Sequence, residues 1–319
     1  MGSKLRSGVV IMKKTVSAIF RKITEIFYFE MRRIEYSERI LINQGRILTN
    51  QQTDKLTSQQ LDINAEEFSI FSQFGEDGII QCLINSIEIE NKTFIEFGVE
   101  DFSESNCRFL MMKDNWRGFV IDGSERNISR LEKSYYYWKY DLQSICAFVN
   151  KDNIDALLDQ SGFDHDLGIL SIDLDGVDYF ILSSISKFKP RILICEFNPI
   201  FGPTRKVTVP YDERFQRFEH HYSGQYWGAS LSALNDVATS LGYGLIGTNS
   251  AGHNAFFVRD DLIRPPFHRI DPERAFNFPT YRDSRDMQGN LSFIEFSARQ
   301  KIIQGLPVLN TDTKKLELL

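Results

Sequence analysis

Apolar and polar positions follow two different patterns along this chain, and the change occurs near Phe68. From Val9 to Tyr36 apolar residues recur every three or four positions, which predicts one amphipathic helix with a basic polar side. Beyond Phe68, short apolar runs typical of buried parallel strands alternate with helical segments. The second pattern predicts a doubly wound α/β sheet.

The best defined unit of this sheet lies around Gly98. A strand leads to Glu96 and Gly98, a helix is expected over Asn106–Lys113, and a second strand, Gly118–Ile121, ends on Asp122. Strand, glycine turn, helix, strand and acid form the nucleotide-binding half of a doubly wound sheet. Gly98 would allow close approach of the backbone to a ligand, and Asp122 is placed to accept ribose hydroxyls.

The loop after the first strand is strongly acidic, with Glu96, Glu100, Asp101 and Glu104. A dinucleotide site uses the glycine-rich turn G-x-G-x-x-G to seat a pyrophosphate, whereas this loop has one glycine and would repel phosphate. S-adenosylmethionine (SAM) carries a sulfonium and an amino group and has no phosphate. Charge therefore favours SAM over NAD as the cofactor, with Glu96 near its amino group.

Acids also fall at the expected carboxyl ends of the later strands. We expect strands over Tyr135–Tyr140, Leu167–Ile172 and Arg191–Cys195. Ligands of open α/β sheets sit beyond such ends. The acids in question are Glu96, Asp122, Asp141, Asp173 and Glu196. We expect Asp141 to contact the adenine, with an ordinary turn aspartate as the alternative. Gln73 and Glu76, just before the helix expected over Ile79–Ile87, could face the cofactor from above.

Two of these strand ends also offer hard oxygen ligands. Asp173, Asp175, Glu196 and Asn198 could hold Mg²⁺, which would lower the pKa of an acceptor hydroxyl. Without a metal, the candidate base is Asp173, Glu196 or His253. A lone histidine in a turn is more often a surface or hydrogen-bonding residue.

The remaining segments complete a three-part organisation: an N-terminal helix and linker arm (1–66), a catalytic domain (67–262) and a C-terminal extension (263–319). Within the catalytic domain we interpret the aromatic-rich connection Pro199–Gly228 as a substrate lid. The terminal hairpin, Gly242–Gly247 and Ala255–Val258, would close the sheet with an antiparallel seventh strand. In the extension, Leu291–Gln304 would form a peripheral helix.

Composition and charge limit the partners and the cell compartment that fit this chain. The chain has 319 residues and a formal net charge of −6, which argues against bulk attraction to nucleic acid. Its four cysteines are scattered without a C-x-x-C, as in a reduced cytoplasmic protein. The basic N-terminal helix has three interpretations: packing on the domain or on a second copy, lying on anionic lipid at the inner face of a membrane, or a disordered artefact of the expressed sequence.

The ordered motifs resemble those of FkbM-type SAM-dependent methyltransferases, a class I family. The similar stretches are Ser72–Gly78, Phe94–Gly98, Ser105–Asn106, Trp116–Gly118 and Leu170–Gly176. Glu196–Pro199, Gly228–Leu231 and Asn254–Arg259 resemble a bacterial subgroup tied to surface glycans. The resemblance covers about Phe68 to Asp261 and implies a seven-stranded class I sheet and methyl transfer to an oxygen of a sugar, free or nucleotide-linked, or of a natural product.

Two rival functions stay open. Asp173-Leu174-Asp175 is a D-x-D pattern, which can hold the metal and nucleotide-sugar phosphate of a glycosyltransferase. A non-catalytic protein of SAM-binding fold that binds a partner through its basic helix is the other. The first leaves the acidic loop unexplained.

Overall fold

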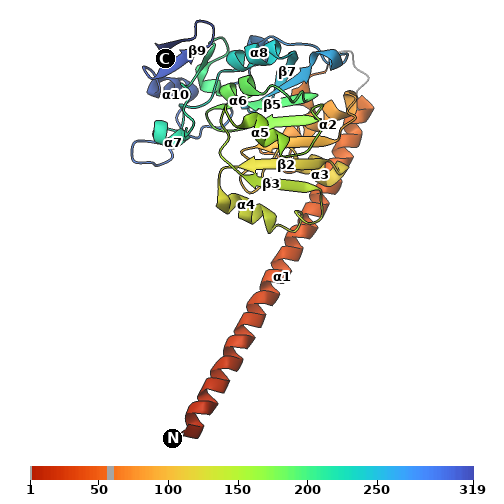
Figure 1. Ribbon diagram of the computed structural model, residues 1–319, viewed down its shortest axis with the longest axis vertical. Helices are drawn as coiled ribbons and strands as arrows, with labels where there is room; N and C mark the ends of the chain where they lie inside the picture. Colours follow the sequence, from red (N-terminus) through yellow and green to blue (C-terminus); the bar gives the residue numbers. More distant parts are fainter. Residues whose placement is uncertain (1, 56–60) are drawn as a thin grey trace. The chain divides into compact units, whose positions relative to one another are not determined.

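The computed structural model describes the backbone of residues 2–55 and 61–319. Side chains are described from Ser17 onward, apart from residues 18 and 53–60. The chain forms two compact units, residues 1–47 and 48–319, which we treat separately. The first is helical, and the second holds the sheet (Figure 1).

Helix α1 spans Gly2–Lys55 and is drawn as one uninterrupted rod (Figure 1). The helix predicted over Val9–Tyr36 is confirmed but is longer than expected. Its polar continuation into the segment expected to be a linker remains helical up to Lys55, and a 3₁₀ turn follows at Ile63–Glu66. The polar segment was predicted to be a linker because it lacks a sustained apolar period. Polar residues are nevertheless compatible with a helix where they face solvent. Among the described residues, none of the helices has a stretch apolar and long enough to cross a bilayer.

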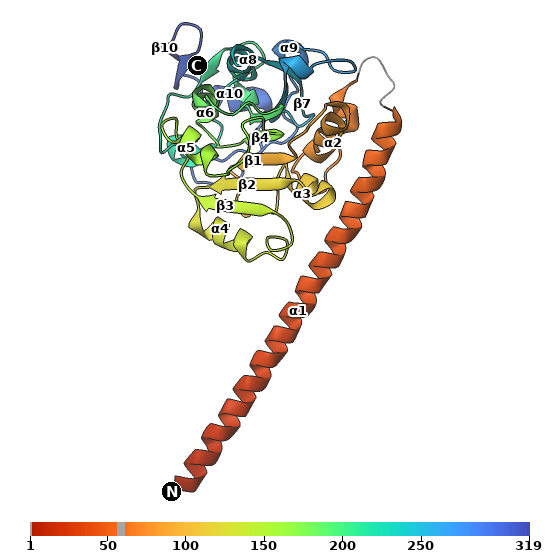
Figure 2. The same ribbon diagram turned by 45° about the vertical axis from the view of Figure 1, so that its right-hand side comes forward.

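Seven strands form the central sheet in the order β3-β2-β1-β4-β5-β8-β7 (Figure 2). Their bounds are β1 Thr93–Phe97, β2 Arg117–Asp122, β3 Leu142–Cys146, β4 Ile169–Ile172, β5 Ile192–Glu196, β7 Tyr243–Thr248 and β8 Asn254–Arg259. The first five strands are mutually parallel, and β8 runs antiparallel to both β5 and β7. This order and the antiparallel strand confirm the predicted class I methyltransferase fold.

Helices between the strands cover the sheet. They are α2 Glu76–Ser86, α3 Arg108–Asp114, α4 Glu125–Glu132, α5 Ile154–Asp159, α6 Asp178–Ser184 and α8 Leu231–Ser240. Alternate residues of a strand face opposite sides of a sheet. Ile95 and Phe97 of β1 accordingly share one core cluster with Leu157 of α5, Ile181 of α6 and Leu234 of α8. Burial of this continuous apolar layer supplies most of the driving force for folding.

The third strand differs from its prediction. Tyr135–Tyr140 forms turns, with backbone hydrogen bonds from the Tyr137 N–H to Ser134 O and from the Tyr140 N–H to Tyr136 O. Lys139 lies over the Tyr135 ring at 4.4 Å. Aromatic residues favour strands on average, but here the ladder with β2 begins only at Leu142.

The C-terminal residues pack on the expected lid rather than trailing from the domain. Within the lid, the 3₁₀ turn Pro199–Phe201 precedes β6 (Val207–Thr208) and α7 (Arg217–His220). Strand β6 forms a small sheet with β9 (Pro307–Asn310) and β10 (Lys315–Leu318) in the order β10-β9-β6. The tail also forms the short helices α9 Pro272–Ala275 and α10 Phe296–Ile302, the latter within the predicted peripheral helix.

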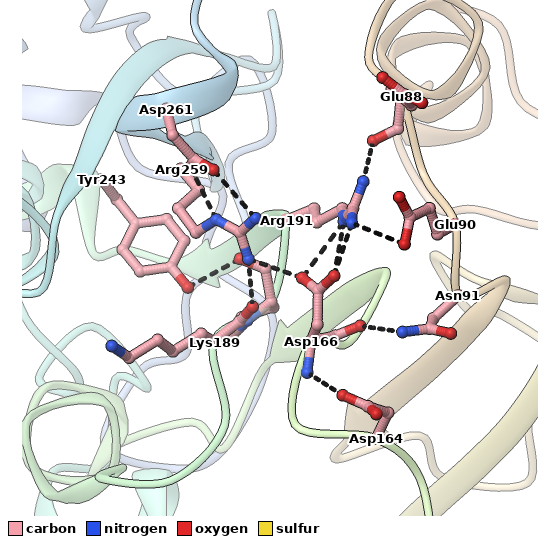
Figure 3. A network of polar contacts seen from close by, with 11 residues as sticks. Glu88, Glu90, Asn91, Asp164, Asp166, Lys189, Arg191, Tyr243, Arg259 and Asp261 are labelled. Carbon is pink, nitrogen blue, oxygen red and sulfur yellow. Dashed lines mark hydrogen bonds and ion pairs between the residues drawn. The ribbon is translucent and has the colours of Figure 1, made fainter.

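An ion-pair network closes the amino-terminal edge of the sheet (Figure 3). Arg191 precedes β5, and its Nε lies 3.1 Å from Oδ2 of Asp166. Arg259, at the end of antiparallel β8, places Nη1 2.7 Å from Oδ1 of Asp166 and Nε 2.7 Å from Oδ1 of Asp261. Nη1 of Arg191 donates to Glu88 O at 2.6 Å. These charges are all paired, so this edge has a structural role.

Candidate active site

A cavity of about 550 Å³ lies at the carboxyl ends of β1, β2, β4 and β5. Its volume is within the usual range for a small-molecule or cofactor site, and its position is where open α/β sheets bind ligands. Its lining contains the acids Glu96, Glu100, Glu104, Asp122, Asp173, Asp175, Glu196 and Glu213. Arg217 is the only lysine or arginine among the lining residues. The lining is therefore rich in acids and poor in basic residues.

Gly98 fixes the floor of this cavity. Its φ is +68°, and a Cβ there would lie 1.7 Å from the carbonyl oxygen of Asp173. The Gly98 N–H donates to Ile121 O at 2.9 Å, which ties the end of β1 to the end of β2. Only glycine meets both demands. The close approach seen here is to the carbonyl of Asp173 after β4, and the approach to a ligand stays a prediction.

Glu96 lines the cavity, as expected, and also organises the acidic loop. Its carboxylate accepts hydrogen bonds from the Ser105 hydroxyl at 2.7 Å and from the Asn106 N–H at 2.8 Å. It also accepts one from the N–H of Cys107, the N-cap of α3, at 3.2 Å. Burial raises the pKa of Glu96 to about 7, partly offset by these donors.

Asp122 holds the end of β2 against the same loop. One oxygen accepts from the Glu100 N–H at 2.9 Å, and the other accepts from the Ser124 N–H at 2.8 Å. Glu100 itself has a φ of +49°, and burial and the charge of Asp101 raise its pKa. The carboxylate of Asp122 is thus fixed at the rim of the cavity where a ribose is expected.

The acids that follow β4 and β5 converge. Ligand oxygens of Asp173, Asp175 and Glu196 all lie within 4.8 Å of one another. Oε2 of Glu196 is buried and has no hydrogen-bond partner in the part of the chain that the structure describes. Burial, then the charge of Asp175, raises the pKa of Asp173 well above its usual value, and burial, then the charge of Asp173, does the same for Glu196. A cluster of half-buried and exposed carboxylates with one unpartnered oxygen fits a divalent cation or a shared proton.

Arg217 reaches this acid cluster from α7 in the lid. Its Nη1 lies 3.4 Å from Oδ1 of Asp175, and its Nη2 lies 3.4 Å from Oδ2 of Asp283. The guanidinium also stacks over the Trp227 ring at 4.8 Å. These contacts hold a positive charge beside the cluster.

Aromatic side chains form part of the cavity wall. Phe148 follows β3, is 68% exposed, and lies so near Gly123 that a Cβ there would be 3.2 Å from its ring. Phe215 comes from the lid and covers Gly176, where a Cβ would be 2.1 Å from its ring. Four lining residues were not predicted from the sequence: Phe148, Glu213, Phe215 and Arg217. Of these four, only Phe148 and Phe215 could have been suspected from the sequence, because large aromatic residues in connecting segments often contact ligands.

Four expected site residues do not line the cavity. Asp141 precedes β3 instead of ending a strand, and its Oδ2 lies 2.6 Å from Nε of Arg117 at the opposite edge of the sheet. The strand boundary was wrong, so the acid expected at that carboxyl end is missing. Glu76 is fully buried and accepts from the side-chain amides of Asn249 at 2.7 Å and Asn254 at 2.8 Å.

Asn198 and His253 are placed as parts of the framework. The Asn198 amide donates to Gln225 O at 3.0 Å and Trp227 O at 2.9 Å, and its oxygen caps the turn at Ile200. Both polar atoms of its side chain are therefore already engaged by the backbone. His253 stacks on Phe74 with ring centroids 5.2 Å apart, and burial lowers its pKa to about 4. A base of that pKa is weak at neutral pH.

Gln73, Glu96, Gly98, Asp122, Asp173, Asp175 and Glu196 are the expected residues that the structure brings together around the cavity. They come from the segment before α2 and from the carboxyl ends of four strands. Their assembly follows from the parallel order of β2-β1-β4-β5, since parallel strands present their carboxyl ends at one edge.

No family model and no curated protein matches this sequence. Among solved structures, 61 chains match. One is a SAM-dependent methyltransferase from Clostridium acetobutylicum, at 9% identity over 58% of this chain and 89% of that chain, with a TM-score of 0.37. Another is a fibrillarin pre-rRNA processing protein from Methanococcus jannaschii, at 8% identity over 56% and 72% of the two chains, with a TM-score of 0.35.

A third neighbour is an O-methyltransferase family protein from Burkholderia thailandensis. It shows 11% identity over 69% of this chain and 71% of that chain, with a TM-score of 0.35. At identities and TM-scores this low, the fold assignment rests on the strand order itself, and the activity is argued from the cavity.

Proposed function

We propose that this protein is a SAM-dependent methyltransferase that acts on a hydroxyl of a sugar or sugar-like acceptor. The observation that carries the proposal is the cavity at the carboxyl edge of a class I sheet, lined by eight carboxylates and one guanidinium. Such a field favours a cationic nucleoside without phosphate over a dinucleotide. The sequence resemblance to FkbM-type enzymes supports the same class and suggests a glycan-related acceptor.

The residues around Gly98 would hold the cofactor. Asp122 offers its carboxylate to the ribose hydroxyls, and exposed Phe148 offers a flat apolar face to the adenine. Glu100 and Glu104 place negative charge where a sulfonium and an amino group would be accommodated. SAM supplies an electrophilic methyl group when it is bound.

The acid cluster would handle the acceptor hydroxyl. Asp173, Asp175 and Glu196 supply only oxygen donors, and the unpartnered Oε2 of Glu196 fits a hard divalent cation such as Mg²⁺. Bound there, the cation would lower the pKa of the hydroxyl. Without a cation, the Asp173–Glu196 pair has a raised pKa suited to accepting the proton. Phe215 and Arg217 of the lid would face the acceptor.

Calorimetry with S-adenosylhomocysteine, the product of methyl transfer, tests the cofactor assignment directly. We expect binding of this nucleoside and none of NAD. Asp122→Asn should weaken binding about tenfold or more, because a charged hydrogen-bond acceptor contributes about 1.5–3 kcal/mol. Asp101→Asn is the matched control, since Asp101 lies in the same acidic loop but does not line the cavity.

The adenine position has its own test. Phe148→Ala should weaken S-adenosylhomocysteine by roughly tenfold, because stacking of a base on an aromatic ring is worth about 1–3 kcal/mol. Phe148 is 68% exposed, so its removal should leave the unfolding temperature nearly unchanged. Full affinity in this variant would place the base elsewhere.

A glycosyltransferase is the second candidate function, because both aspartates of the D-x-D pattern, Asp173 and Asp175, line the cavity. Thermal stabilisation by a nucleotide-sugar with Mn²⁺, together with no response to S-adenosylhomocysteine, would replace the methyltransferase proposal by that one. Binding of S-adenosylhomocysteine without methyl transfer to any of a panel of nucleotide-linked sugars would point to another acceptor or to a non-catalytic role.

A further inference from the structure

Nine of the thirteen large exposed apolar side chains of α1 between Ile19 and Leu48 fall on a seven-residue repeat. The other four are Ile23, Tyr28, Phe29 and Tyr36. Adjacent pairs occur at Ile19–Phe20, Ile26–Phe27, Ile40–Leu41 and Ile47–Leu48, and Arg33–Ile34 keeps the register between them. The apolar members of these pairs are between 37% and 70% exposed. We call these five pairs the heptad stripe.

The strictness of this period is informative. A straight helix turns once in 3.6 residues, so a strict seven-residue repeat drifts by about 20° per heptad around it. A helix that packs on a flat surface or on a domain shows apolar residues with the 3.6-residue period. A strict seven-residue repeat stays on one side of the helix only if the helix winds with another into a left-handed supercoil. The stripe runs through just over four heptads, from residue 19 to residue 48. It differs from a standard coiled-coil seam, which has apolar residues at positions a and d, because its apolar residues lie at adjacent positions.

The residues that would face each other suit a parallel pairing of two identical α1 helices. The second members of the pairs, Phe20 to Leu48, occupy position a of the heptad, and the first members occupy position g. In a parallel pair, a g residue faces the e residue five positions later in the other chain. Ile26 then faces Met31, and Arg33, the one charged g residue of the stripe, faces Glu38 of the second copy.

We propose that two copies of this chain associate through the heptad stripe as a parallel, in-register coiled coil. Glu30, Ser37 and Gln44 occupy position d, so the seam is weaker than one with apolar residues at both a and d, and association depends on concentration. The proposal is independent of the enzymatic assignment.

Lipid is the less favoured occupant. Residues 17–47 carry six basic and four acidic side chains. Two of these acids pair within the helix, Glu30 with Arg33 at 3.1 Å and Glu35 with Arg39 at 3.0 Å. A helix that lies on anionic lipid has a polar face rich in lysine and arginine. The mixed charge of α1 suits another helix of the same sequence better.

Sedimentation velocity of the full chain over a wide concentration range tests the proposal. We expect a monomer–dimer equilibrium that Phe27→Asp weakens more than about tenfold, since it places two carboxylates in the apolar seam. Phe29→Asp is the matched control: Phe29 is 79% exposed against 65% for Phe27, but it lies outside the heptad stripe. Circular dichroism checks that both variants keep their helix content.

Orientation is tested with single cysteines introduced at Phe20 or Leu48, in a chain where exposed Cys146 is replaced by serine. A parallel pair predicts that each variant forms a disulfide with itself. Crosslinks only between the two variants when mixed would overturn the parallel arrangement. A wild-type chain that stays monomeric, equal dissociation by both aspartate variants, or flotation of monomers with phosphatidylglycerol vesicles would overturn the proposal itself.

Discussion

The two edges of the central sheet hold carboxylates in opposite electrostatic settings. At the amino edge, Asp166 lies between Arg191 and Arg259, whose hydrogen bonds hold its pKa below the usual value (Figure 3). At the carboxyl edge, half-buried Asp173 and Glu196 lie together, and their pKa values are raised. Asp166 at the first edge is paired with two arginines, whereas Oε2 of Glu196 at the second edge has no hydrogen-bond partner among the described residues.

This difference separates stability from function. Paired charges restrict the strand ends and tie β4, β5 and β8 together, as a framework requires. Clustered like charges cost folding free energy, and proteins keep such clusters where a ligand or a reaction needs them. The comparison therefore predicts that changes at the amino edge cost stability and changes at the carboxyl edge cost ligand binding.

The largest effect is expected at Gly98, where the carboxyl edge depends on close backbone packing. Gly98→Ala should lower the free energy of unfolding by about 3 kcal/mol or more, because the added Cβ meets a backbone oxygen and the left-handed φ adds strain. Gly162→Ala is the control, since Gly162 has a φ of +63° but open space around it. It should lose only about 1–2 kcal/mol, the cost of the left-handed conformation alone. Equal losses in urea denaturation would show that the contact with Asp173 is unimportant.

Asp166→Asn tests the amino edge. It removes the shared carboxylate and leaves two guanidinium groups facing each other, one of them with a side chain only 8% exposed. We expect a loss of about 2–3 kcal/mol, less than for a fully buried pair because Asp166 is 31% exposed. Binding of S-adenosylhomocysteine should be unchanged below the melting transition.

Asp164→Asn provides the matched control for that variant. Asp164 lies two residues away and contacts the backbone N–H of Asp166 through an oxygen that asparagine retains. A stability loss as large as that of Asp166→Asn would assign the effect to the loop rather than to the ion pairs.

Glu196→Gln tests the other half of the comparison. It should lower Mn²⁺ affinity, measured by electron paramagnetic resonance, by between about 10- and 100-fold, because a charged oxygen ligand is lost. Stability should not fall, since the amide resembles the protonated acid that burial favours. Wild-type Mn²⁺ affinity in this variant would remove the metal from the proposed function. A loss of stability would contradict the electrostatic contrast.

The sequence predicted the carboxyl edge better than it predicted the lid. Acids after apolar runs could be found because a buried parallel strand is a continuous apolar segment that ends at the sheet edge. The same rule gave a wrong prediction for Asp141. The aromatic run before it resembles a strand in the sequence but forms turns in the structure. The fold could be predicted from the alternation of buried strands with helices and from the final hairpin, both of which are local patterns.

The lid contribution could not be derived in this way. Arg217 and Phe215 reach the cavity through the pairing of β6 with β9, whose partners are about a hundred residues apart in sequence. Glu76 was misassigned for a related reason: its partner Asn249 lies 173 residues away. Local periodicity carries no information about such contacts.

The smallest effect, and the finest test of the contrast, is the sign of the pH dependence. The pKa of Glu96 in the folded protein is about 7 and exceeds its unfolded value, so the stability it contributes is present at low pH and is lost as pH rises toward 7. Asp166 has a lowered pKa, so its contribution is present above the unfolded pKa and is lost as pH falls. Each group can add at most about 1.4 kcal/mol per pH unit. Urea denaturation between pH 2 and 8 should therefore show two opposite slopes. Glu96→Gln should remove a downward slope of stability between about pH 4 and 7, whereas the deficit of Asp166→Asn should shrink only below about pH 4. Slopes of the same sign in the two comparisons would mean that the two edges do not differ electrostatically.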